Sequence, residues 1–175
     1  QSKIAPISLW HSHYQNQGTV GIITGKVSGN LEIIDVDIKN DPKKTIMTEY
    51  SDLIPADLLR KLIIQTTPNN GFHLIYRCPE VEIDCNQKLA LNSQKEIIIE
   101  TRGEGGYFCT SMVNNKILQG TFDLHNLYVE IPVITKQERQ LLLDMARSLT
   151  RWFPTEGADN SKNNKQFTYT EPAIN

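Results

Sequence analysis

Two aspartates lie in a segment of the chain that is otherwise apolar except for Glu32, and their spacing suggests a metal site. They are Asp35 and Asp37, within residues 31–38. Side chains two apart on a strand point to the same face, so the two carboxylates would project together. Adjacent carboxylates on a buried strand repel each other and lose hydration. A divalent cation relieves both problems, and oxygen ligands suit Mg²⁺ or Mn²⁺. The same pattern also fits a strand whose end faces water, so both interpretations stay open.

A third acid follows a second apolar run. Glu100 ends the segment 96–100 where the chain enters a glycine-rich turn, and Arg102, two residues later, would share its face. A surface ion pair between these two side chains is one interpretation, and such pairs contribute little. Glu96 lies on the same face and is an alternative partner for Arg102. Three carboxylates at the ends of two buried strands are a usual ligand set for two-metal phosphoryl transfer.

A third segment adds polar groups that would suit a triphosphate. In residues 72–78, His73 and Arg77 share one face, and the opposite face is apolar. The preceding turn, Asn69-Asn70-Gly71, exposes backbone amides that suit phosphate oxygens. A histidine in a core strand is more often structural, but the polar turn beside it favours a phosphate contact for His73. For Arg77 the structural and the functional interpretations are equally supported.

Composition limits the classes of protein to which the chain can belong. It has 175 residues, of which 39% are hydrophobic and 22% are charged, as in ordinary globular proteins. A net charge of -2 disfavours a duplex binder with a broad basic face, but it allows an enzyme that meets nucleic acid in one local groove. No apolar run approaches the roughly 18 residues of a membrane helix. Cys78, Cys85 and Cys109 form no CxxC pair, which favours a reduced, cytoplasmic protein; a zinc site using Cys78, Cys85 and a histidine stays open.

Helices and strands alternate along the chain, which predicts an α+β (α/β) fold with mixed sheets. Strands are expected at residues 20–24, 31–38, 62–66, 72–78, 95–101 and 107–112. Helices are expected at 6–16, 41–50, 55–61 and 136–152, the last opened by a capping box. Asp41-Pro42 is a helix-start signal. Asn114-Asn115 indicates a hairpin whose return strand begins at Lys116.

Three motifs occur in order and carry a family resemblance. They are Ile33-Ile34-Asp35-Val36-Asp37, Gly71-Phe72-His73 and Ile98-Ile99-Glu100, with the lead-in Gly21-Ile22-Ile23-Thr24-Gly25 and the ending Glu100 to Tyr107. On these residues the chain resembles the primase-polymerase family (bifunctional DNA primase/polymerase) of the archaeo-eukaryotic primase superfamily, over about residues 5–133. Two features depart from the family pattern: an Asn-Asn-Gly turn stands where a Ser-Gly-Gly-like turn is usual, and Glu100 stands where Asp is common.

The resemblance implies a two-module fold, an α/β half and an RNA-recognition-like half with the site between them. It implies a template-directed nucleotidyltransferase that joins nucleoside triphosphates to a 3′-hydroxyl. Asp35, Asp37 and Glu100 would be catalytic and hold two Mg²⁺ or Mn²⁺ ions. The nucleotide-binding residues that it implies are His73 and Arg102, together with Lys26. The turn and the strand face described above add Asn70 and Arg77 as candidates. The partners implied are nucleoside triphosphates, a single-stranded DNA template with its primer, and a fused or separate helicase or primase accessory module.

Three segments are expected in the chain. Residues 1–133 would form the catalytic core, and 134–153 would form a C-terminal helix on or following that core. Residues 154–175 would form a polar tail or linker. The start at Gln1, without a basic and then apolar leader, is interpreted as a trimmed end.

Alternatives to the primase-polymerase interpretation remain. A two-metal nuclease or phosphohydrolase would use the same acids with water as the nucleophile, and a non-catalytic replication-initiation module would keep the fold alone. Template binding has one candidate surface, the basic side chains of the last helix, which could equally be a solvated face. These are Arg139, Arg147 and Arg151.

Overall fold

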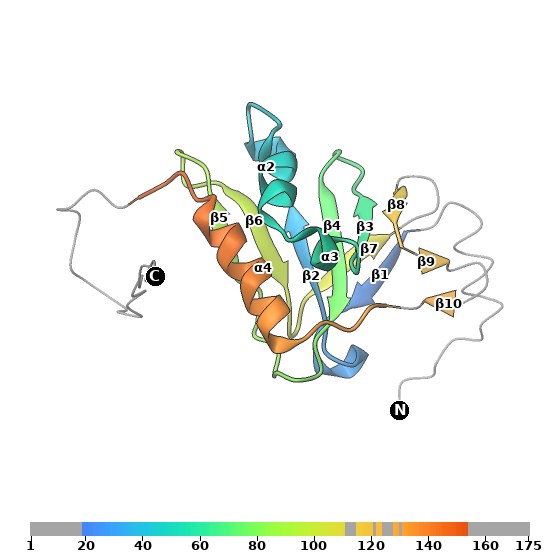
Figure 1. Cartoon of the computed structure of the whole chain (residues 1–175). Helices are drawn as coiled ribbons and strands as arrows, with labels where there is room; N and C mark the ends of the chain where they lie inside the picture. The colour runs from blue at the N-terminus through green and yellow to red at the C-terminus, as the bar shows by residue number, and fades with distance from the viewer. Residues whose placement is uncertain (1–18, 111–114, 121, 124–127, 130, 154–175) are drawn as a thin grey trace.

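The computed structural model describes residues 19–110, 115–120, 122–123, 128–129 and 131–153. The helix expected at 6–16, the turn at Asn114 and the expected tail 154–175 lie outside these ranges. Within them, the chain forms an α+β fold, as predicted, around one six-stranded sheet (Figure 1). The strands of this sheet, in spatial order, are β5 (Lys88–Leu91), β6 (Ile97–Arg102), β2 (Leu31–Val36), β4 (Phe72–Arg77), β3 (Ile63–Thr66) and β8 (Ile117–Gln119).

The pairing of these strands is antiparallel throughout, which corrects the expectation of mixed sheets. The helical connection from β2 to β3 does make these two strands parallel. However, β4 returns from β3 through a short turn and lies between them, so each direct neighbour is antiparallel. Parallel pairs in the described part of the chain are confined to the isolated bridges Arg77–Val133 and Cys85–Glu104.

One face of the sheet is covered by helices (Figure 1). They are α2 (Ile46–Leu53), α3 (Ala56–Leu59) and α4 (Lys136–Ser148). The larger core lies between these helices and the strand side chains of that face, which include Ile34, Leu74 and Tyr76. None of the helices in the described residues is both long and apolar enough to cross a bilayer.

Helix α2 begins at Ile46 and not at the predicted Asp41-Pro42 signal. Asp41 nevertheless caps the helix, because its Oδ2 accepts hydrogen bonds from the amides of Thr45 (2.7 Å) and Ile46 (2.8 Å). The short 3₁₀ turn η2 (Ile38–Asn40) separates the end of β2 from this cap. For α4 the predicted capping box is confirmed, with Thr135 as the N-cap.

The other face of the sheet is covered by a two-stranded antiparallel ribbon, β1 (Val20–Ile23) and β7 (Tyr107–Thr110). Phe108 of this ribbon packs on Ile33 and Ile75 of the sheet to form a second, smaller core. The hairpin predicted at Asn114-Asn115 would pair β7 with β8. This pairing is wrong, because β7 pairs with β1 and β8 pairs with β3. A further short ribbon joins β9 (Phe122–Asp123) to β10 (Tyr128–Val129).

A buried ion pair fixes α4 to the central strand β2. Arg139 donates to both carboxylate oxygens of Glu32, at 2.6 and 3.0 Å, and the Tyr76 hydroxyl donates to the same carboxylate at 2.7 Å. Glu32 is fully buried and Arg139 is 7% exposed. The hypothesis that Arg139, Arg147 and Arg151 form a template-binding stripe is therefore wrong for Arg139, whose charge is used inside the protein.

The other two arginines of the predicted stripe are also paired with acids. Arg147 donates to Asp144 at 2.9 Å, and Arg151 binds Asp41 and Glu49. In the described residues these contacts direct the cations of α4 and its C-terminal extension toward the protein's own carboxylates. A stripe of free positive charge does not form there.

Candidate active site

A single row of polar side chains crosses five neighbouring strands on the ribbon side of the sheet. The register places Lys88 opposite Glu100, Glu100 opposite Asp35, Asp35 opposite His73, and His73 opposite Gln65. Directly opposed residues of antiparallel strands share a face, with Cβ atoms about 4.5–5.5 Å apart. Antiparallel pairing therefore brings together the acid of the first motif, the histidine of the second and the acid of the third.

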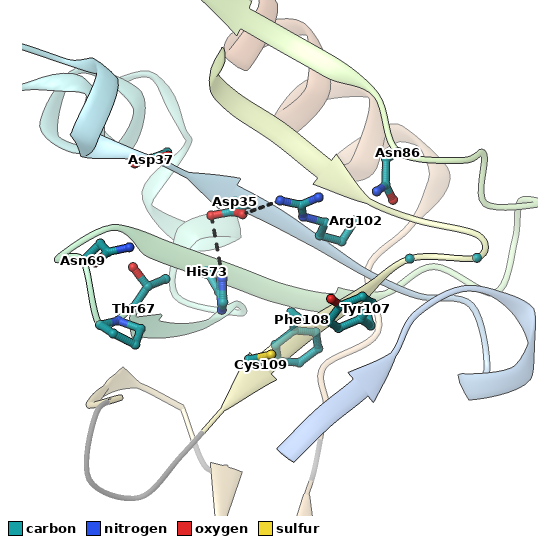
Figure 2. Close-up of a pocket in the computed structure, with 13 residues that line it drawn as sticks. Asp35, Asp37, Thr67, Asn69, His73, Asn86, Arg102, Tyr107, Phe108 and Cys109 are labelled. Carbon is teal, nitrogen blue, oxygen red and sulfur yellow. Dashed lines mark hydrogen bonds and ion pairs between the residues drawn. The ribbon is translucent and has the colours of Figure 1, made fainter. Parts of the chain in front are cut away.

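A pocket of about 390 Å³ opens over this row. Figure 2 shows it between the β3–β4 turn, the ends of β2 and β6, and the strand β7. Its lining includes Asp35, Asp37, His73 and Arg102, together with Thr67, Pro68, Asn69, Asn86 and residues 105–109. The pocket thus combines two carboxylates, one guanidinium and one imidazole with several amide and hydroxyl groups.

Arg102 joins two of the acids. Its Nη2 lies 2.6 Å from Glu100 Oε1 and 3.3 Å from Asp35 Oδ2. Burial raises the pKa of the Glu100 carboxyl; the negative charges of Asp35 and Asp37 add to this increase, and Arg102 opposes it. The guanidinium therefore stabilises two carboxylates that would otherwise repel each other. Glu96, the alternative partner, lies elsewhere and accepts a hydrogen bond from Asn92 at 2.8 Å.

Asp37 follows β2 and also lines the pocket. One of its oxygens, Oδ1, accepts a hydrogen bond from the Lys39 amide at 2.8 Å and so caps the turn η2. Among the residues that the structure describes, no three acid, histidine or cysteine side chains are already gathered as a metal cage. Asp35 and Glu100 do hold one positive charge between them, the Arg102 guanidinium, so this position favours a cation.

His73 is 6% exposed and has a different partner on each ring nitrogen. Its Nε2 lies 3.7 Å from Asp35 Oδ1, and its Nδ1 lies 2.8 Å from the side-chain nitrogen of Gln65. The edge-to-face contact with Phe108, with ring centroids 5.4 Å apart, holds the imidazole plane. Burial lowers the pKa of His73; Asp35 opposes this effect and Arg102 adds to it. Burial therefore disfavours the protonated, charged form of this ring.

The β3–β4 turn is pressed against the end of β2. Asn70 adopts a left-handed conformation (φ 62°), and the Thr67 amide donates to the Gly71 carbonyl at 2.8 Å. A Cβ on Gly71 would lie 2.6 Å from the Val36 carbonyl oxygen, so only glycine allows this close approach. The turn brings Thr67 and Asn69 to the pocket, whereas Asn70 is exposed and does not line it.

Besides Asn70, two more of the candidate nucleotide-binding residues lie away from the pocket lining. Arg77 is at the far end of β4, where its Nε donates to the Ser28 carbonyl at 3.1 Å and its side chain packs on Gly29. Lys26 is exposed in the turn η1 (Lys26–Ser28), and its backbone amide donates to Glu104 at 2.7 Å. The structure therefore brings together Asp35, Asp37, Glu100, His73 and Arg102, but not these two cations.

Several residues near the site were given no role in the sequence analysis. They are Gln65 and Lys88 in the polar row, and Asn86 and Tyr107 on the pocket wall. Gln65 could have been found from the sequence, because a hairpin around the 67–71 turn places it opposite His73. Lys88 could not, because its strand β5 carries no clear alternation and pairs with β6 through register shifts.

Comparison with known families gives one match. The family model described as "Bifunctional DNA primase/polymerase, N-terminal" matches residues 2–119. This range contains the whole pocket lining and every member of the polar row. A comparison with curated proteins found no matching relative.

Proposed function

The chain belongs to the bifunctional DNA primase/polymerase family, and from this premise we propose that it is a template-directed nucleotidyltransferase. Family membership supports a primase/polymerase type of function in general. The finer proposal is that the chain joins nucleoside triphosphates to a 3′-hydroxyl along a single-stranded DNA template. The observation that carries it is the register that aligns Glu100, Asp35 and His73 in one row beneath an open polar pocket.

We propose that Asp35, Asp37 and Glu100 hold two Mg²⁺ or Mn²⁺ ions. The donor set fits this proposal chemically, since hard divalent cations prefer carboxylate oxygens. The Arg102 guanidinium between Asp35 and Glu100 supports it as well, because a positive charge is already favoured there. When bound, such ions supply charge neutralisation at the attacked phosphate and a lower pKa for the attacking hydroxyl.

The protein's own residues would bind and orient the nucleotide. Arg102 would bind the triphosphate, since a guanidinium fork suits phosphate oxygens. His73, whose Nε2 is on the Asp35 side of the ring, would donate from this nitrogen to a phosphate oxygen in the pocket. The β3–β4 turn and the β7 backbone form opposite walls that would hold the nucleotide over the polar row.

Asp35→Asn tests this function. The substitution keeps the size of the side chain but removes the charge at the centre of the row, so we expect primed nucleotide incorporation to fall about a thousandfold or more. The assay is extension of a labelled primer on a single-stranded template with Mn²⁺ or Mg²⁺. In parallel, Mn²⁺ with a deoxynucleoside triphosphate should raise the Tm of the wild type but not that of the variant.

Asp52→Asn, a substitution of an exposed aspartate on α2, is the matched control and should leave incorporation unchanged. Full incorporation by a folded Asp35→Asn protein would refute the assignment of this row. Metal-dependent cleavage of the strands without any incorporation would instead favour the two-metal nuclease.

A further inference from the structure

Gln65 is a fully buried polar side chain at the back of the pocket, on β3. It lies directly opposite His73 in the β3–β4 hairpin, and its Nε2 is 2.8 Å from His73 Nδ1. Its other end is also occupied, since the Thr110 hydroxyl donates to Gln65 Oε1 at 3.3 Å. Thr110 belongs to β7, on the covering ribbon, and is 1% exposed. A hydrogen-bonded chain thus runs from the ribbon through Gln65 to the imidazole.

The direction of these hydrogen bonds determines which ring nitrogen of His73 carries the proton. The Gln65 amide lies with its oxygen toward the Thr110 hydroxyl, which donates to it, and with its N–H₂ group toward His73 Nδ1. An amide nitrogen only donates, so His73 Nδ1 must accept. A neutral imidazole carries a single N–H, which must then lie on Nε2. That nitrogen is the one on the side of Asp35 and the pocket.

We infer that Gln65, oriented by Thr110, is a positioning residue that holds His73 in its Nε2–H tautomer and so keeps a neutral hydrogen-bond donor aimed at the pocket. The consequence for the site rests on the proposed function, in which that donor serves a triphosphate oxygen. An apolar side chain at position 65 would leave Nδ1 buried without a donor, and the ring could then turn over. Burial of a polar atom without a partner is costly, which accounts for a buried glutamine in the strand Ile63–Thr66.

The tautomer can be measured directly on the full chain. The protein has four histidines, so selective ¹⁵N-histidine labelling gives few ring signals, and a His73→Gln variant identifies those of His73. Long-range ¹H–¹⁵N spectra at neutral pH distinguish a protonated ring nitrogen from an unprotonated one. In the wild type we expect Nε2 protonated and Nδ1 unprotonated. A wild-type ring with its proton on Nδ1 overturns the inference.

Gln65→Glu is the sharpest variant, because a carboxylate can only accept. It should draw a proton onto His73 Nδ1, reversing the signal of that nitrogen. Gln119→Glu makes the same change on the adjacent strand β8, where the glutamine binds the carbonyls of Leu59 and Leu62, and should leave the His73 signals unchanged. An unprotonated Nδ1 in folded Gln65→Glu protein overturns the inference.

Thr110→Val gives an independent test if the buried charge of Gln65→Glu prevents folding. Without the hydroxyl the Gln65 amide is free to reverse, so the His73 spectrum should show both tautomers. A wild-type spectrum in this variant also overturns the inference. In a primer-extension assay, Gln65→Leu should raise the KM for the nucleotide several-fold, up to about tenfold, with a smaller change in kcat.

The spectroscopic result is separable from the proposed function. Addition of Ca²⁺ and a deoxynucleoside triphosphate should shift the His73 Nε2 proton signal of the wild type. If the tautomer responds to the position 65 and 110 variants but no nucleotide shift occurs, the positioning role of Gln65 stands and the nucleotide role of His73 fails.

Discussion

Replacing Arg102 with alanine is expected to change two binding affinities in opposite directions. The guanidinium contacts Glu100 at 2.6 Å and Asp35 at 3.3 Å, so a divalent cation bound as proposed would have to displace it. Without Arg102, that cost disappears and cation binding becomes tighter. A nucleoside triphosphate, in contrast, loses a positively charged partner and binds more weakly.

The contacts in the structure set the size of both effects. A hydrogen bond to a charged group contributes about 1.5–3 kcal/mol. The Arg102 side chain is 32% exposed, so solvent screening favours the lower end of that range. About 1.4 kcal/mol corresponds to tenfold in affinity. We therefore expect Arg102→Ala to bind Mn²⁺ about tenfold more tightly, and a deoxynucleoside triphosphate about tenfold more weakly.

Manganese binding can be followed by the electron paramagnetic resonance signal of free Mn²⁺, and nucleotide binding by calorimetry in the presence of Ca²⁺. Arg60→Ala, which removes an exposed arginine at the end of α3, is the matched control and should change neither affinity. Equal Mn²⁺ affinities in wild type and Arg102→Ala would show that the guanidinium does not compete with a cation. Equal nucleotide affinities would place the phosphate contacts elsewhere.

Two further predictions concern stability. Arg139→Met should lower the free energy of unfolding by about 3–5 kcal/mol, because it leaves the Glu32 carboxylate buried without its cation, whereas Arg139→Met combined with Glu32→Gln should lose much less. Urea unfolding measures both, and a loss below about 1 kcal/mol in the single variant contradicts the reasoning. Burial by itself would raise the pKa of Asp41, but hydrogen bonds from two backbone amides and from Arg151 lower it below its usual value. This stabilisation is thus present above about pH 4 and is lost as the pH falls through the folded-state pKa. Asp41→Asn should therefore be less stable than the wild type near neutral pH, and its free energy of unfolding, measured with urea between pH 6 and 2.5, should fall less steeply toward acid. A decrease as steep as that of the wild type would contradict the reasoning.

Local patterns in the sequence were sufficient to predict most of the strands. Alternation and apolar runs predict strands at 31–38 and 72–78, and the structure has them at Leu31–Val36 and Phe72–Arg77. The same two-residue period predicts that Glu100 and Arg102 share a face, and their side chains are in contact. These predictions succeed because the direction of a side chain on a strand depends only on its position in the strand.

Pairing between distant segments could not be predicted in the same way. Arg139 lies in the polar run that opens helix α4, and nothing local shows that it meets Glu32, 107 positions earlier. Arg77 shares a face with His73 but lies four residues further along the strand. There its side chain contacts the turn that contains Ser28, and the local sequence gives no sign of this contact. The start of α2 was also misjudged, because Asp41 caps the helix from outside its first turn.

The polar row also links the proposed catalysis to the order in which the chain folds. Its members come from five separate strands, and neighbours in the row such as Asp35 and Glu100 are distant in sequence. No local segment can assemble the row, so nucleotide or metal binding during refolding should appear only with the last, cooperative phase. By mass action, any ligand of the row then stabilises the whole sheet at once. Ligand binding would therefore serve as a probe of global folding in this domain, and the active site would carry no stability separate from that of the sheet.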